Sequence, residues 1–182
     1  MLFSAVLVIL VEPMKTLFVL RHAKSSWDDP DLADFDRPLN DRGRSAAPFM
    51  GEVMNRNGFS PDVILSSPDV RARDTAMHVK EAGDLSAEIR FDEGIYEASP
   101  QALRQIVAAI DDQNRSAMVV GHNPGIEGFI SFLTGRLESI PTAALAVIDL
   151  DIAKWSDINS ASGVLRTVSR PKHEMKTLGK GN

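Results

Sequence analysis

The chain has 182 residues, of which 43% are hydrophobic and 25% are charged, as expected for one globular domain with a sizeable core and not for a disordered or fibrous chain. It carries 20 lysines and arginines against 25 aspartates and glutamates, a net charge of −5, so it has no general attraction to nucleic acid or to an anionic membrane. The absence of cysteine excludes disulfides, thiolate catalysis and zinc sites built on sulfur.

An apolar run from Leu2 to Val11 lies near the start of the chain. It is too short for a membrane-spanning helix, which needs about 20 residues, and it lacks the basic region and the cleavage site of a secretory signal. We interpret residues 1–13 as an N-terminal extension, peripheral to the fold or translated from an upstream start codon, with the domain beginning near Met14. A packed strand and a degenerate export signal are the alternatives.

Short apolar runs typical of buried strands alternate with helical patterns along residues 14–170, and no repeat or low-complexity linker interrupts them. A short strand is expected between Arg71 and Glu97. The longer strands are expected at residues 16–20, 63–65, 117–120, 144–150 and 164–168.

Local signals place the starts and ends of the helices. A serine followed by proline is typical of a capping residue and the first helical position, and glycine is typical of a helix end. An apolar face at helical spacing begins at Ala46. The expected starts are Ser67-Pro68, Ser99-Pro100 and Asn123-Pro124, and the expected ends are Gly58 and Gly135.

This alternation predicts an α/β fold: a three-layer sandwich with a mostly parallel central sheet and helices on both faces. One domain is expected over residues 14–170, followed by a polar C-terminal tail, residues 171–182, which we expect to be frayed. In such sheets ligands bind beyond the carboxyl ends of the strands. The residues that follow each strand are therefore the candidates for function.

Two arginines and two histidines occupy these positions. Arg21 and His22 follow the first strand, Arg71 lies in the helix after the second, and His122 follows the third long apolar run. The planar guanidinium suits phosphate oxygens, and a neutral imidazole is a nucleophile toward phosphorus whose pKa nearby cations lower. Because the same cations can stabilise the transition state, no metal is obligatory. The set predicts a site for phosphoryl transfer.

Each motif taken singly also fits a structural role, such as a solvated arginine, a capping serine or a hydrogen-bonded histidine in a turn. Their shared place at the ends of strands favours a phosphate site. The four histidines, His22, His78, His122 and His173, show neither HxH nor HExxH spacing, and the carboxylates form no ligand cluster in the sequence. No metal or other cofactor is expected.

Three segments in this order resemble the histidine phosphatase superfamily (branch 1), and within it the SixA-like phosphohistidine phosphatases. They are RHAKS from Arg21 to Ser25, SSPDVRARDTA from Ser66 to Ala76 and GHNPG from Gly121 to Gly125. The resemblance covers most of residues 15–170. Less specific parts of it are Leu39 to Gly43 and the surroundings of Trp155 and Pro171. It implies a phosphoglycerate mutase-like fold.

The resemblance also implies roles for the four residues. His22 would be the nucleophile that becomes phosphohistidine, and Arg21, Arg71 and His122 would complete the phosphate pocket, with His122 donating a hydrogen bond to a phosphoryl oxygen. Ala23 stands where the superfamily usually has glycine, as in the SixA-like branch. Lys24 replaces an acidic residue common in the mutase-like relatives, which disfavours a phosphoglycerate mutase.

The general acid is less well marked. Ester hydrolysis needs a proton for the leaving alkoxide, and Glu97 lies between Arg71 and His122, where related enzymes place an acidic residue. A solvated loop glutamate is the structural alternative for Glu97. The other candidates are Asp28, Asp29 and Asp36. A phosphohistidine substrate needs the acid less, because its P–N bond is labile.

The sequence predicts a cytoplasmic, metal-independent phosphatase that acts through a phosphohistidine intermediate on phosphohistidine in a protein. A protein substrate is favoured because no insertion between Arg71 and His122 is long enough for a lid domain. The alternatives are a phosphomonoesterase for a small phosphoester, with Glu97 as acid, and a phosphate-binding module without turnover. No nucleic-acid or membrane partner is expected, and the sequence leaves the oligomeric state open, with a monomer compatible.

Overall fold

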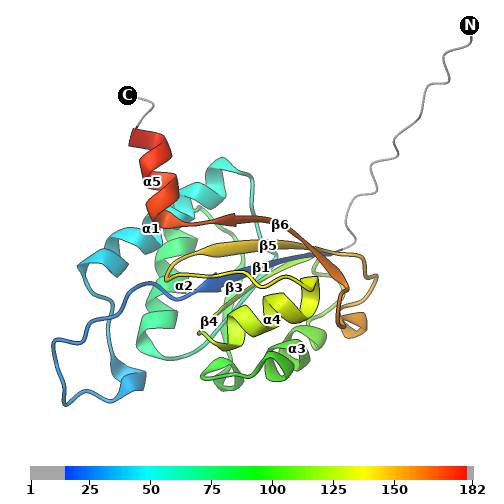
Figure 1. Cartoon of the computed structure of the whole chain (residues 1–182), viewed down its shortest axis with the longest axis horizontal. Helices are drawn as coiled ribbons and strands as arrows, with labels where there is room; N and C mark the ends of the chain where they lie inside the picture. Colours follow the sequence, from blue (N-terminus) through cyan, green and yellow to red (C-terminus); the bar gives the residue numbers. More distant parts are fainter. Residues whose placement is uncertain (1–14, 180–182) are drawn as a thin grey trace, which may run out of the picture.

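A six-stranded sheet forms the middle layer of the computed structural model, which describes residues 15–179 (Figure 1). Its strand order is β3-β2-β4-β1-β5-β6. The strands β3, β2, β4 and β1 run parallel to one another, whereas β5 is antiparallel to both of its neighbours, β1 and β6. The strands are β1 (Lys15–Arg21), β2 (Val63–Ser66), β3 (Glu88–Phe91), β4 (Ser116–Gly121), β5 (Leu145–Leu150) and β6 (Gly163–Ser169).

The central strand β1 is apolar from Leu17 to Leu20 because both of its faces are covered there. Leu17 and Val19 belong to one hydrophobic cluster, and Phe18 and Leu20 belong to the other. This alternation follows from the two-residue period of a strand.

The helices pack on the two faces of the sheet (Figure 1). Helices α1 (Asp41–Arg56) and α2 (Val70–Ala82) bury their apolar residues in the cluster that contains Phe18. Helices α3 (Pro100–Ala108) and α4 (Gly125–Thr134) do the same in the cluster that contains Leu17. Three short 3-10 helices, η1 (Asp34–Asp36), η2 (Glu93–Ile95) and η3 (Trp155–Asp157), lie in the loops. The predicted α/β sandwich with a mostly parallel sheet is confirmed.

The helix signals were correct in part. Ser99 caps α3 by accepting a hydrogen bond from the amide of Ala102, and Gly135 closes α4 at a φ of 67°. Gly58 lies one residue beyond the cap of α1, at a φ of 65°. The predicted start at Ser67-Pro68 is wrong, because α2 begins at Val70 with Asp69 at the N-cap position and no capping hydrogen bond.

The predicted C-terminal tail is also corrected. Residues Pro171–Gly179 form a helix, α5, which lies against α1. Proline fits the first turn of a helix, and the carbonyl oxygen of Arg170 accepts hydrogen bonds from the amides of His173 and Glu174. The extension predicted over residues 1–13 lies outside the described residues. None of the helices between residues 15 and 179 combines the length and the apolar character that a membrane span requires.

Helices α1 and α2 approach closely at Gly51. A Cβ atom there would lie 2.5 Å from the carbonyl oxygen of Val79 and 2.8 Å from the amide nitrogen of Gly83. We expect Gly51→Ala to lower the free energy of unfolding by about 1–3 kcal/mol, because overpacking outweighs the gain in helix propensity. Urea denaturation measures it, with Gly179→Ala as control, since no atom lies within 4 Å of that position. Equal stability of the two variants would contradict a tight contact.

Candidate active site

The three motifs begin at one edge of the sheet, because the strands that lead into them, β1, β2 and β4, are parallel neighbours. Arg21 pairs with Gly121, and Ser66 pairs with Val120. The amide of His22 donates to the carbonyl oxygen of Gly121 at 3.0 Å. The residues after each strand therefore lie side by side, and the imidazole rings of His22 and His122 are 4.8 Å apart between centroids.

A cavity of about 790 Å³ opens at this edge, a volume suited to a small ligand or an inserted side chain. Charged and titratable side chains line one part of it, and the first turns of α3 and α4 form the rest. The former are His22, Asp34, Arg71, Glu97 and His122. The structure thus brings three of the four predicted phosphate-binding residues, and Glu97, into one cavity.

The His22 ring is buried and has a defined tautomer. Its Nδ1 lies 2.7 Å from the carbonyl oxygen of Ala23, and because a carbonyl can only accept, Nδ1 carries the proton and Nε2 has a free lone pair. The pKa of His22 is lowered from 6.5 to about 3, chiefly by burial, with a further contribution from the charges of His122, Arg71 and Arg21 that outweighs the hydrogen bond to Ala23. His22 is therefore a neutral base and nucleophile at physiological pH.

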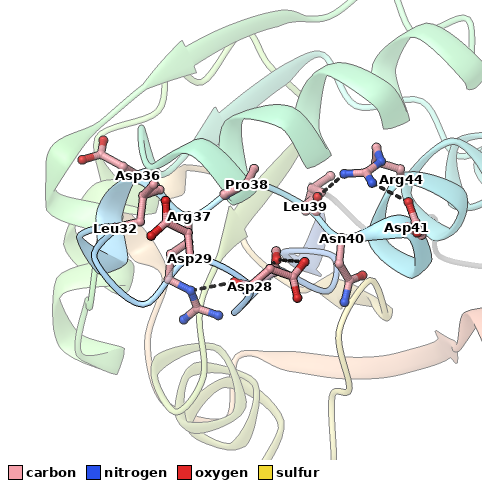
Figure 2. Close-up of a pocket in the computed structure, with 11 residues that line it drawn as sticks. Asp28, Asp29, Leu32, Asp36, Arg37, Pro38, Leu39, Asn40, Asp41 and Arg44 are labelled. Atoms are coloured by element: carbon pink, nitrogen blue, oxygen red, sulfur yellow. Dashed lines mark hydrogen bonds and ion pairs between the residues drawn. The ribbon is translucent and has the colours of Figure 1, made fainter.

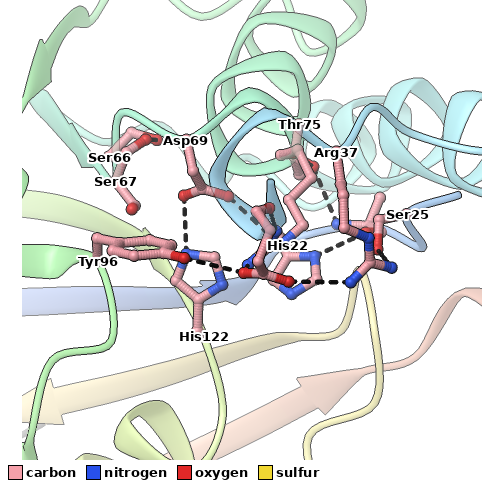
Figure 3. Close-up of polar contacts among 12 residues, drawn as sticks. His22, Ser25, Arg37, Ser66, Ser67, Asp69, Thr75, Tyr96 and His122 are labelled. Atoms are coloured by element: carbon pink, nitrogen blue, oxygen red, sulfur yellow. Dashed lines mark hydrogen bonds and ion pairs between the residues drawn. The ribbon is translucent and has the colours of Figure 1, made fainter. Parts of the chain in front are cut away.

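The His122 ring is fixed by a buried carboxylate, as Figure 3 shows. Its Nε2 donates to Oδ1 of Asp69 at 2.8 Å, and Asp69 is completely buried. Burial by itself raises the pKa of Asp69, but the hydrogen bond and the charges of His122 and Arg71 lower it below its ordinary value. With Nε2 engaged by Asp69, His122 can donate to a further oxygen only from Nδ1, which requires the imidazolium form.

Asp34 is a charged residue of the site that the sequence did not single out. Its Oδ2 accepts hydrogen bonds from Nη2 of Arg71 at 2.7 Å and from the hydroxyl of Tyr96 at 2.9 Å, and Arg37 binds Oδ1 at 3.0 Å. Partial burial raises the pKa of Asp34, yet these donors bring it down to about 2. The carboxylate therefore occupies Arg71 as an anion, in the manner expected of a phosphate oxygen.

Arg21 does not line the cavity. Its Nη1 donates to the carbonyl oxygen of Ile140 at 2.9 Å, and its buried Nε has no hydrogen-bond partner within residues 15–179. Its charge still contributes to the lowered pKa of His22. A half-buried guanidinium with an unused donor beside an imidazole is suited to an anionic ligand.

The acidic candidates differ in position. Glu97 is exposed at the rim of the cavity, on a left-handed backbone with a φ of 51°. Asp28, Asp29 and Asp36 instead line a separate cavity of about 440 Å³ (Figure 2), away from His22. Those three carboxyl groups therefore do not meet the candidate nucleophile.

Three residues of the site, Asp69, Tyr96 and Asp34, are only weakly marked in the sequence and were not predicted. Asp69 is part of the SSPDVR segment, but it resembles a helix cap there, and only the fold turns its carboxylate toward His122. Tyr96 is the only tyrosine of the chain and directly precedes Glu97. Asp34 is one of several acidic residues in its loop, and nothing in the spacing distinguishes it.

The arrangement can transfer a phosphoryl group. A neutral nucleophile lies beside Arg71 and His122. The guanidinium of Arg71 can stabilise the equatorial oxygens of the transferring phosphoryl group, and His122 can donate a hydrogen bond to them in its imidazolium form. No cluster of three or more histidine, aspartate or glutamate side chains that could hold a metal ion occurs within residues 15–179. The charge stabilisation that these residues themselves provide comes from the arginines and histidines.

Comparisons with known proteins agree with this geometry. Residues 17–100 match the histidine phosphatase superfamily (branch 1). An uncharacterized protein of Mycobacterium tuberculosis is 31% identical over 157 residues, 80% of this chain and 96% of that protein. An uncharacterized chloroplast protein of Arabidopsis thaliana is 31% identical over 158 residues, 82% and 72% of the two chains. A structure from Agrobacterium tumefaciens, assigned as the phosphohistidine phosphatase SixA, superposes with a TM-score of 0.75 at 29% identity, covering 86% of this chain and 98% of that chain.

The lowered pKa of His22 predicts an imidazole that does not titrate near neutrality. We expect the ring resonances of His22 to stay constant from about pH 8 to pH 5, while an ordinary histidine titrates near 6.5. Because the unfolded chain binds this proton and the folded chain does not, folding stability should fall as the pH drops below 6.5. A proton–carbon NMR titration measures the chemical shifts of the His22 ring, and the His22→Ala variant identifies which resonances belong to it. An inflection near pH 6.5 would contradict the burial argument.

The carboxylate of Asp34 should compete with oxyanions for Arg71. We expect Asp34→Asn to bind tungstate about three- to tenfold more tightly. The substitution removes the carboxylate charge that competes with the anion for Arg71, but it keeps the shape of the side chain. Isothermal titration calorimetry measures the Kd. Asp36→Asn is the matched control, since Asp36 lies in the same 3-10 helix and lines the other cavity. Weaker binding by Asp34→Asn would show that the carboxylate assists the anion.

Proposed function

The chain belongs to the histidine phosphatase superfamily (branch 1) and is a phosphatase, and from this we propose that it removes the phosphoryl group from phosphohistidine in a protein, through a phosphohistidine intermediate on His22. The observation that carries the proposal is the neutral His22 ring, whose Nδ1 is bound to the carbonyl oxygen of Ala23 beside Arg71 and His122. The likeness to the Agrobacterium SixA structure supports the same substrate class.

In the first step, the lone pair of His22 Nε2 attacks phosphorus. The new N–P bond forms as the N–P bond of the substrate breaks, and the substrate histidine leaves as a neutral imidazole when its second nitrogen carries a proton. In the second step, water attacks phosphorus and the bond to Nε2 breaks. Because the hydrogen bond to Ala23 keeps Nδ1 protonated, His22 also leaves as a neutral imidazole, with inorganic phosphate as the product.

The cationic groups stabilise both steps. Arg71 and an imidazolium His122, supported by Asp69, would bind the phosphoryl oxygens, and Arg21 adds positive charge behind His22. These groups supply the charge stabilisation that a metal ion supplies in other phosphatases, so the proposed mechanism is metal-independent. We also propose a cytoplasmic location for this phosphatase, as expected from the sequence.

The acidic residues support phosphohistidine over an ester as the substrate. An alkoxide leaving group needs a proton donor, yet the pKa of Asp34 is about 2, so the carboxyl group beside Arg71 carries no proton at neutral pH. Glu97 is exposed at the rim. A phosphoimidazole needs neither of them. The open cavity also leaves room for a side chain that projects from another protein.

The experiment measures phosphate release in EDTA from a phosphohistidine-bearing protein and from a panel of small phosphoesters. We expect His22→Ala to lose at least about 10³-fold in rate on every substrate. Glu97→Gln should change phosphohistidine turnover by less than about threefold, because general acid catalysis is not required there.

The remaining outcomes distinguish the alternatives. A preference of the wild type for one small ester, together with a loss of about 10²–10⁴-fold in Glu97→Gln, would make the protein a phosphomonoesterase with Glu97 as acid. Release from no substrate, with phosphorylated ligands still bound, would make it a phosphate-binding module.

A further inference from the structure

A second cavity, outside the active site, is lined by cationic side chains. It has a volume of about 460 Å³ and lies between Lys24, the start of α1, the loop before β5 and the first turns of α5. We name it the basic groove; its charged or titratable residues are Lys24, Arg42, Arg170, Lys172, His173 and Lys176. No acidic side chain lines it, although acidic residues outnumber basic ones in the chain as a whole.

The basic groove opens at the same edge of the sheet as the candidate active site. Leu20 pairs with Leu145, and Leu145 pairs with Ser169, so the start of β5 and the end of β6 lie at the edge where His22 leaves β1. Strands are about 4.8 Å apart, which places the end of β6 about 10 Å from β1. The amide of Ala143 also binds the carbonyl oxygens of Arg21 and His22 at 3.1 Å each, joining the wall of the groove to the site.

Most of these cations lack an anionic partner within the protein. Arg170 forms an ion pair with Glu138. Lys24, Arg42, Lys172 and Lys176 form none with any residue between 15 and 179, and all four are exposed. Like charges gathered in one concave surface repel one another and attract an anion.

The positions of three groove residues on their helices do not favour helix stability. Arg42 lies in the first turn of α1, and Lys172 and His173 lie in the first turn of α5. The helix dipole disfavours cations at an N-terminus and favours anions there. Both helix dipoles therefore add to the positive potential of the basic groove.

Neighbouring surfaces at the same edge have the opposite charge. The cavity beside α4 is lined by Glu127 and Glu138. In the cavity beside η1 (Figure 2), aspartates outnumber the two arginines, Arg37 and Arg44, and both arginines form ion pairs with aspartates. Among these three cavities, only the basic groove is lined by cations without an acidic side chain. Such asymmetry fixes the orientation of a charged partner.

We propose that the basic groove binds an acidic segment of the phosphoprotein substrate and so selects which phosphohistidines reach His22. The proposal rests on the proposed function. Aspartate or glutamate side chains of the substrate pair with Lys172, Lys176 and Arg42, while the apolar walls at Ala46 and Pro141 contact the aliphatic parts of the bound segment. The end of β6 lies about 10 Å from β1, a distance that about three extended residues span.

The test uses two phosphohistidine peptides of equal length, one with three glutamates and one with three glutamines placed three to five residues from the phosphohistidine. We expect the full-length protein to hydrolyse the glutamate peptide with a kcat/KM at least about tenfold higher, through a lower KM, and with a steeper loss in added salt. Lys172→Glu combined with Lys176→Glu should abolish this preference and leave the hydrolysis of free phosphohistidine within about twofold.

The matched control is Arg136→Glu combined with Lys154→Glu, which changes the net charge equally at exposed positions outside the groove. We expect it to retain the preference, and Lys172→Arg with Lys176→Arg to retain it as well. Circular dichroism melting shows that each variant is folded.

The outcomes separate this proposal from the proposed function. Equal kcat/KM for the two peptides, with His22-dependent release of phosphate, would overturn the proposed role of the basic groove and leave the phosphatase function intact. Release from neither peptide nor from free phosphohistidine would overturn both. Binding to vesicles with 30% phosphatidylserine that is lost in Lys172→Glu/Lys176→Glu, without any peptide preference, would overturn the proposal in favour of a membrane surface.

Discussion

The register of β1 against β4 determines the geometry of the whole site. Arg21 opposite Gly121 places His22 and His122 at the same height beyond the sheet, with their rings 4.8 Å apart. A shift of one residue would turn every side chain of β1 to the other face. That shift is strongly disfavoured because Leu17 and Phe18 are buried in different clusters. The packing of the core therefore holds the two imidazoles together.

The positive charge of the site is balanced by two carboxylates with different properties. Asp69 is completely buried and binds His122, so it is part of the fixed scaffold. The Asp34 side chain is 49% exposed and binds Arg71 from a loop. An entering anion can replace the second carboxylate without the cost of uncovering a buried charge. The difference keeps Arg71 paired in the free protein and available to a ligand.

Backbone and side-chain contacts around Ala23 connect the nucleophile to the arginine. The carbonyl oxygen of Ala23 fixes the tautomer of His22, and its amide donates to the hydroxyl of Thr75 at 2.9 Å. That hydroxyl in turn donates to the carbonyl oxygen of Arg71 at 2.6 Å. The residue that replaces the usual glycine is thus buried between β1 and α2, where it aligns the two halves of the site. Beyond this centre, the charges of the surface divide the edge into a basic side and an acidic side.

The sequence by itself determined the strands, most of the helices and the three motifs, because these follow from local periodicity and from residues that are adjacent in the chain. It did not determine the start of α2 or the helix α5, where local signals competed or were weak. Nor could it distinguish Asp34 from Asp28 and Asp36, or show that Asp69 faces His122, since those contacts join residues 37 and 53 positions apart. Only the tertiary structure decides such contacts, because they depend on how loops fold across the edge of the sheet.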